Sequence, residues 1–211
     1  MSTVLSRESI HLVERDDTVH VVAEEYFYKT ESYYTILSHE IHGIPVAPGS
    51  SAVLDAYIVP LCLERAGSAG IPVADCTISH SCAQYPAVLY GLNYFASSSE
   101  YSVVRDSARG KETVRHITNN GKYPLCYQRL AEGENIEGHV AIFGKSCPED
   151  DDIRGYARSL YEVFGIPLVT MVYVRGEDGA RLSSLAPTRY SSLSNAEKTL
   201  LRAYITHQEF L

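Results

Sequence analysis

The feature that most constrains the fold is the stretch at residues 85–106, where two short apolar runs flank a serine-rich segment. The runs are residues 87–90 and 101–104, and three consecutive serines lie between them at residues 97–99. Short runs of β-forming residues on either side of a polar loop are typical of two strands that pair with each other. The sequence therefore predicts a β-hairpin here.

The N-terminal part alternates between strand and helix signals. Residues 19–23 are a β-branched run that predicts a buried strand, and residues 44–46 predict a second strand parallel to it. Between them, apolar side chains recur at helical spacing over residues 33–41. Pro60 then opens a further helix at residues 61–66. The order strand, helix, strand predicts a right-handed β-α-β unit.

The C-terminal part predicts three helices and four strands. The strands are expected at residues 125–130, 139–143, 168–174 and 180–185. One helix is expected at residues 110–116, a second around residues 153–164 and a third after the capping box of Ser194 and Glu197. The acids at residues 149–152 precede the second helix, so we expect them to offset its dipole and not to bind a metal.

The order of these motifs resembles the ATP-grasp family. Residues 69–75 read AGIPVAD, and residues 123–136 read YPLCYQRLAEGENI. In that family a GIPVPDT-like entry precedes a lysine-bearing strand, a glycine-rich phosphate loop and a VQEYIEGEDI-like adenine hinge. Residues 33–57 also resemble the lobe in front of RimK-like ligases, and an accessory domain found N-terminal to RimK-like ATP-grasp proteins. The resemblance implies an α/β fold, with a small Rossmann-like pre-ATP-grasp lobe (residues 1–67) followed by a reduced, ATP-grasp-like α+β lobe (residues 68–211).

The same resemblance marks where the family's catalytic groups would fall. ATP-grasp chemistry needs lysines on the phosphates and carboxylates on Mg²⁺. The expected charges are absent at four positions, namely Tyr90, Val172, Ser184 and Ala186. The phosphate loop falls on residues 93–100, which contain no glycine. The resemblance thus implies a chain that does not use Mg-ATP in the family's manner, and we expect no cofactor.

Some binding residues are nevertheless expected. Glu132 falls where the family places a ribose-contacting acid, and Arg129 replaces an acid in the same hinge. Tyr26 and Tyr28 follow the first predicted strand, where we expect them to contact a substrate or a partner.

Two large aromatic residues, Tyr94 and Phe95, lie in the loop of the predicted hairpin. Exposed aromatic side chains often anchor partner proteins, so we expect these two to form a docking surface. The alternative, in which they fold back onto the sheet, stays open.

The residues Cys76, His80 and Cys82 form a C-x3-H-x-C cluster of zinc-compatible types. The cluster has no obvious fourth ligand nearby, and isolated cysteines commonly pack as small apolar groups, so we expect no metal site. The five cysteines of the chain are odd in number and scattered, which favours free thiols.

The formal net charge of −8 disfavours a nucleic-acid groove or an anionic membrane surface as partner. No apolar run approaches the ~18 residues of a membrane span, and the first ten residues are polar. We therefore expect a cytoplasmic protein.

These observations predict a non-ATP-using accessory or substrate-binding protein of an amide- or peptide-bond-forming carboxylate-amine ligase system. The expected partner is a catalytic ATP-grasp ligase or a second copy of the chain, and the expected ligand is an amino acid or a peptide. Two alternatives stay open. One is an enzyme with new, nucleotide-independent chemistry on the same scaffold, using Tyr26, Tyr28, His80 and Cys82. The other is a divergent ATP-dependent ligase.

Overall fold

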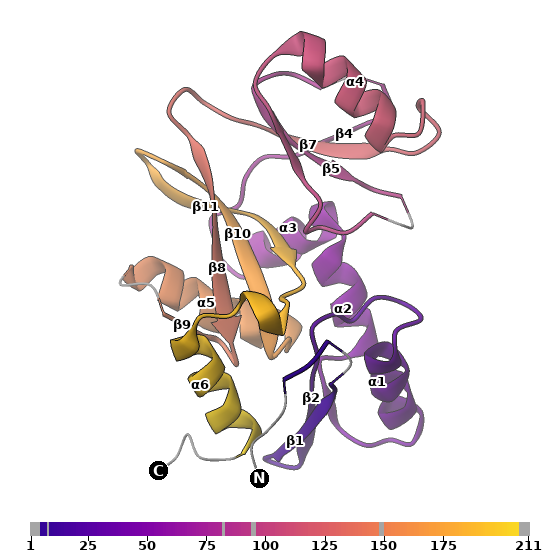
Figure 1. The fold of residues 1–211 in the computed structure, drawn as a ribbon, viewed down its shortest axis with the longest axis vertical. Helices are drawn as coiled ribbons and strands as arrows, with labels where there is room; N and C mark the ends of the chain where they lie inside the picture. The colour runs from indigo at the N-terminus through magenta and orange to yellow at the C-terminus, as the bar shows by residue number, and fades with distance from the viewer. Residues whose placement is uncertain (1–4, 8, 82, 94–95, 148–149, 207–211) are drawn as a thin grey trace. The chain divides into compact units, whose positions relative to one another are not determined.

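The computed structural model describes residues 5–7, 9–81, 83–93, 96–147 and 150–206 (Figure 1). These residues form three β-sheets and six α-helices, which confirms the expected α/β class. The chain divides into two compact units. Unit 1 contains residues 1–54, 139–170 and 187–211, and unit 2 contains residues 55–138 and 171–186. These units each combine separate segments of the chain, whereas the predicted lobes, residues 1–67 and 68–211, are contiguous. The division into two lobes stays a prediction.

Unit 1 begins with a three-stranded sheet in the order β1-β2-β3. The strands are β1 (His11–Arg15), β2 (Thr18–Val22) and β3 (Val46–Ala47). Strands β2 and β3 are parallel and α1 (Glu31–Ile41) connects them, which confirms the predicted strand-helix-strand order. Strand β1 was not predicted; it pairs antiparallel with β2 through a turn at Asp16 and Asp17, both with positive φ.

The core of unit 1 joins this sheet to later segments. Helix α5 (Asp151–Phe164) ends at Gly165, which is left-handed, and α6 (Asn195–Ile205) begins with the predicted capping box. The short helix η1 (Tyr190–Ser192) precedes α6. Buried side chains from η1, α6, β1 and β2 belong to one apolar cluster, which includes Val13, Val22, Tyr190, Leu201 and Tyr204. Tyr161 of α5 is partly buried and packs against this cluster.

Unit 2 contains an antiparallel sheet in the order β4-β7-β5-β6. Its strands are β4 (Thr77–Ser79), β5 (Ala87–Gly91), β6 (Ser102–Val104) and β7 (Leu125–Arg129). Strands β5 and β6 are the predicted hairpin, with Ala87 opposite Val104. Helix α4 (Ser107–Ile117) lies over one face of the sheet (Figure 1), where Leu89 and Leu125 belong to its apolar cluster. Because side chains alternate along a strand, their neighbours Tyr90 and Cys126 belong to the opposite face.

A second four-stranded sheet has the order β11-β10-β8-β9. Its strands are β8 (Asn135–Ile142), β9 (Lys145–Ser146), β10 (Leu168–Gly176) and β11 (Gly179–Ala186). The boundary between the units falls within β8, β10 and α2 (Ser50–Tyr57). In unit 2, α3 (Val59–Ser68) contacts β11, and the backbone of Ala74 donates to Leu182 at 2.8 Å. In the described part of the chain, no helix is long and apolar enough to cross a membrane.

Candidate functional site

A polar network on the sheet of unit 2 occupies the position where the sequence resemblance places the catalytic lysine. The Tyr90 hydroxyl lies 2.6 Å from Ser183 Oγ, and Ser183 Oγ donates to Gln128 Oε1 at 2.6 Å. The Gln128 amide donates back to the Ser183 carbonyl at 2.7 Å. All three side chains are at most 1% exposed. Strands β5, β7 and β11 are thus joined through buried side chains.

The electrostatics of this network keep it neutral. Burial raises the pKa of Tyr90 above its usual range, against the opposing effect of the hydrogen bond to Ser183. Because the single hydroxyl proton of Ser183 is directed to Gln128, its oxygen is the acceptor for the Tyr90 proton. The donors and acceptors of the network therefore satisfy one another.

The other three positions at which the sequence resemblance places charged groups are also buried and uncharged. Val172 and Ala186 are each 3% exposed, and Ser184 is fully buried. No group of three or more His, Cys, Asp or Glu side chains in the described residues could hold a metal ion. An ATP-grasp fold implies Mg-ATP, but neutral buried side chains can neither neutralise phosphates nor supply the anionic ligands that Mg²⁺ prefers. The residues present do not fit Mg-ATP bound in the family's manner.

The predicted hinge residues lie at the end of β7, beside a pocket of about 300 Å³. Arg129 lines this pocket and is exposed, whereas Glu132 is exposed and does not line it. The sequence reading missed Glu134, whose carboxylate pairs with Arg181 and accepts from the Ala131 backbone at 2.7 Å. The acid-glycine-acid pattern at residues 132–134 was the available signal, because a positive-φ glycine, here Gly133, lets the following acid turn back to the chain.

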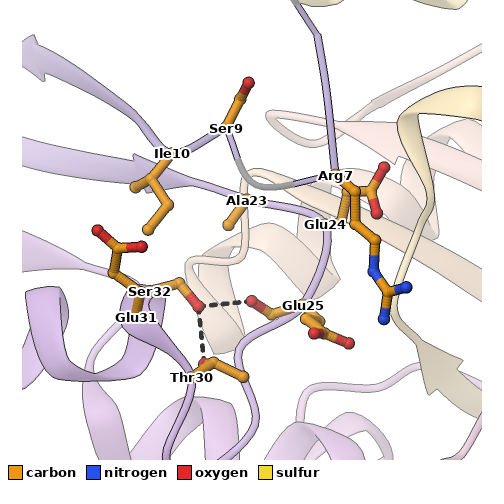
Figure 2. Close-up of a pocket in the computed structure, with 9 residues that line it drawn as sticks. All are labelled: Arg7, Ser9, Ile10, Ala23, Glu24, Glu25, Thr30, Glu31 and Ser32. Atoms are coloured by element: carbon orange, nitrogen blue, oxygen red, sulfur yellow. Dashed lines mark hydrogen bonds between the residues drawn. The ribbon is translucent and has the colours of Figure 1, made fainter.

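Another pocket, of about 380 Å³, lies in unit 1 directly after β2 (Figure 2). Its lining residues include Glu24, Glu25, Glu31 and Arg7, which Figure 2 shows as sticks. The Ser32 hydroxyl fixes the segment by donating to the Glu25 carbonyl at 2.6 Å. Charged side chains of both signs therefore gather where the first strand of the parallel pair ends.

The two tyrosines expected to bind a ligand near this pocket have different environments. Tyr26 is buried, and its hydroxyl donates to the Val21 carbonyl at 2.9 Å and accepts from the Ala23 backbone at 3.0 Å. Tyr28 is 52% exposed and packs edge-on against Tyr33. Neither lines the pocket. Tyr26 supports the loop, and Tyr28 offers an accessible ring; a binding role for either stays a prediction.

The C-x3-H-x-C cluster lies partly outside the described residues, since Cys82 is not among them. Cys76 contacts Cys126, and a hydrogen bond from that thiol lowers the pKa of Cys76 to about 7. His80 is exposed. Cys76 therefore already has a sulfur partner that the sequence reading did not consider, and the absence of a metal here stays a prediction. Tyr94 and Phe95 also lie outside the described residues.

No family model and no curated protein matches this sequence. Solved structures do match the fold. The RimK domain protein ATP-grasp from Sphaerobacter thermophilus is 14% identical with a TM-score of 0.65, over 91% of this chain and 81% of that chain. D-alanine–D-alanine ligase from Bacillus anthracis, complexed with ATP, is 9% identical with a TM-score of 0.59, over 84% and 72% of the two chains.

A third structure contains a peptide. ATP-grasp ligase PsnB complexed with precursor peptide PsnA2 and AMPPNP is 15% identical with a TM-score of 0.57, over 95% of this chain and 84% of that chain. The three likenesses define the class: this chain has the fold of the ATP-grasp ligases. More particularly, the likeness extends to a RimK-like member, as the sequence resemblance predicted.

Proposed function

We propose that this chain is a non-ATP-using, ATP-grasp-like accessory or substrate-binding protein of an amide- or peptide-bond-forming ligase system. The observation that carries the proposal is the buried Tyr90–Ser183–Gln128 network. It joins the strand that would bear the family's lysine to the strand that would bear its metal ligands. Opening this region for phosphates would expose or orphan three satisfied polar side chains, which is costly.

The ligand we propose is an amino acid or a peptide. Support comes from the charged pocket after β2, which offers carboxylates to an amino group and a guanidinium to a carboxylate. The PsnB structure with a precursor peptide supports the same class of ligand by analogy of fold. A catalytic ATP-grasp ligase or a second copy of this chain would be the partner, and the cytoplasm the compartment.

Titration calorimetry tests the nucleotide part of the proposal. Purified protein is titrated with ATP in the presence and absence of Mg²⁺, with the Bacillus anthracis D-alanine–D-alanine ligase as a positive control. We expect no saturable heat with this chain up to millimolar ATP. A magnesium-dependent dissociation constant in the micromolar range would refute the proposal and favour the divergent ATP-dependent ligase.

The accessory part needs a separate measurement. Light scattering after gel filtration reports whether the chain forms dimers, and co-elution with a co-expressed ATP-grasp ligase reports a heteromeric complex. We expect one of the two assemblies. A monomer that forms no complex, yet shows catalytic activity without nucleotide, would instead identify the alternative enzyme.

A further inference from the structure

A second pocket in unit 1 gathers positive charge in an otherwise acidic chain. Its volume is about 610 Å³, and its cationic lining residues are Arg7, Arg189, Lys198 and Arg202. They come from the N-terminal segment, from the residue before η1 and from α6. We call this the basic pocket. Its concentration of cations contrasts with the formal net charge of −8 for the whole chain.

The cations of the basic pocket are not neutralised within the described structure. None of the four forms an ion pair with a described residue. Glu24 is the carboxylate among the described lining residues, and it is buried with Oε1 accepting the Tyr190 backbone N–H at 2.7 Å. Among the described residues, the charges of the pocket are therefore available to an anionic ligand.

Helix stability does not explain the cations on α6. Lys198 and Arg202 are four residues apart, so they share one face of the helix, where like charges destabilise each other. Lys198 also lies near the N-terminal end, where the helix dipole favours acids. Only Arg202, in the last turn, has a favourable position with respect to the dipole. Lys198 in particular is placed against the preferences of its own helix.

The chemistry of the surroundings distinguishes a carboxylate ligand from a phosphate. Phosphates commonly bind to the free N–H groups of a helix N-terminus. On α6 the capping box engages two of those groups, because Ser194 and Glu197 bond to each other's backbone N–H. The other residues of that first turn, Asn195 and Ala196, are not among the lining residues of the basic pocket. The pocket thus offers side-chain cations without a backbone cradle, and its volume exceeds what a single small anion needs.

The pocket directly after β2 adjoins the basic pocket, and we call it the acidic pocket because three of its described lining residues carry carboxylates. The two pockets share Arg7 and Glu24, and Glu25 and Glu31 line the acidic side. We propose that the basic pocket binds a short acidic peptide, with side-chain carboxylates on Arg189, Lys198 and Arg202 and the free amino end directed to the acidic pocket. This names the substrate class of the proposed function, and it rests on that function only for the premise that the ligand is a peptide.

The test is fluorescence anisotropy with a tetraglutamate peptide that carries a free amino end and a C-terminal dye. The pocket variant is Lys198→Glu with Arg202→Glu. The matched control, Arg105→Glu with Lys111→Glu, makes the same charge change at exposed positions of unit 2. At about 0.15 M salt, exposed charges more than about 8 Å apart are largely screened, so the control charges should not act on the pocket from a distance. We expect binding to weaken about tenfold or more in the pocket variant and less than about twofold in the control.

Two further peptides and one further protein variant test which groups of the ligand are recognised. Acetylation of the peptide amino end should weaken binding, and a tetraglutamine peptide should not bind. Arg189→Ala should weaken tetraglutamate binding without touching α6, which keeps the test valid if the helix variant loses its fold in circular dichroism.

Several results would overturn this inference. They are no binding of tetraglutamate at millimolar concentration, an equal loss in pocket and control variants, equal binding of tetraglutamine, and displacement by pyrophosphate at lower concentration than by unlabelled tetraglutamate. The last would identify a phosphate site. Each leaves the nucleotide titration of the proposed function unaffected, and Mg-ATP binding would refute that function while leaving this test intact.

Discussion

The Tyr90–Ser183 hydrogen bond predicts a specific pattern of stability in a double-mutant cycle. The variants are Tyr90→Phe, Ser183→Ala and the pair together. Tyr90→Phe removes one donor but leaves the Ser183 hydroxyl bonded to Gln128, so we expect a loss of about 1–1.5 kcal/mol. Ser183→Ala removes the Ser183 hydroxyl from two buried groups, the Tyr90 hydroxyl and Gln128 Oε1, so we expect a loss of about 2–4 kcal/mol.

The double variant distinguishes a hydrogen bond shared by the two side chains from independent effects of changing two buried residues. It lacks the Tyr90 hydroxyl that loses its Ser183 acceptor in Ser183→Ala alone, so its loss should be smaller than the sum of the single losses by about 1–2 kcal/mol. Tyr101→Phe is the matched control, because the Tyr101 ring lies 5.7 Å from the Tyr90 ring and no described residue bonds its hydroxyl. We expect that control to change stability by less than about 0.5 kcal/mol.

The assay is equilibrium unfolding in urea, followed by circular dichroism and by tyrosine fluorescence, with the slope of the transition checked for each variant. Additivity of the two single variants within about 0.3 kcal/mol would refute the shared hydrogen bond. The proposal that this region is closed to nucleotide would then lose the observation on which it depends.

Three other predictions follow from separate parts of the chain. Burial, followed by the charge of Arg15, lowers the pKa of His20, so this residue contributes stability above about pH 6.5 that is lost as the pH falls through the folded-state pKa. Between about pH 7 and 5, the free energy of unfolding of His20→Gln should therefore fall less than that of the wild type, and parallel pH profiles would contradict this. Gly155→Ala should stabilise α5 by about 0.5–1 kcal/mol because its Cβ meets no atom within 4 Å, whereas Gly110→Ala should destabilise α4 by about 1–3 kcal/mol because its Cβ would clash with the Tyr85 ring. Thermal melts of both variants test this, and a stabilised Gly110→Ala would be inconsistent with this packing. Truncating Tyr94 and Phe95 to alanine should weaken association with a co-expressed ligase by about 2 kcal/mol without changing the melting temperature, and the reverse outcome would assign them to the core.

The sequence predicted the elements whose signals are local. The helix that follows Ser194 was predictable because a capping box and an apolar face lie within one short window, and both are present in the structure. The hairpin of β5 and β6 was predictable for a similar reason, because its two runs are separated only by a polar loop. Local chemistry is sufficient for such elements.

Strand β1 was not predicted, because its local sequence lacks the usual signals of a strand. Its residues include His11, Glu14 and Arg15, and its connection to β2 uses Asp16 and Asp17 at positive φ in place of the usual Asn-Gly or Asp-Gly. Neither the strand nor the turn has a typical composition. Pairing with β2 and burial of Val13 in the core of unit 1 stabilise the strand, and a window of a few residues contains neither contact.

The candidate sites were harder to predict than the elements. The resemblance marked Tyr90 and Ser184 as missing charges, but it could not show that the Tyr90 hydroxyl bonds Ser183, which is 93 positions away. The basic pocket escaped notice for the same reason, since Arg7 and Lys198 come from opposite ends of the chain. Periodicity and motif spacing report neighbours along the chain, whereas these sites depend on contacts made by folding.

The core of unit 1 also has a consequence for synthesis on the ribosome. Val13 and Val22 pack in the same cluster as Leu201 and Tyr204, so the first hairpin is made long before the side chains that cover it. At ~5–20 residues per second, the delay is on the order of 10 to 40 s. During that interval the nascent hairpin exposes apolar side chains whose cover is completed by α6, so we expect chaperones to engage this part of the chain until translation of α6 is complete.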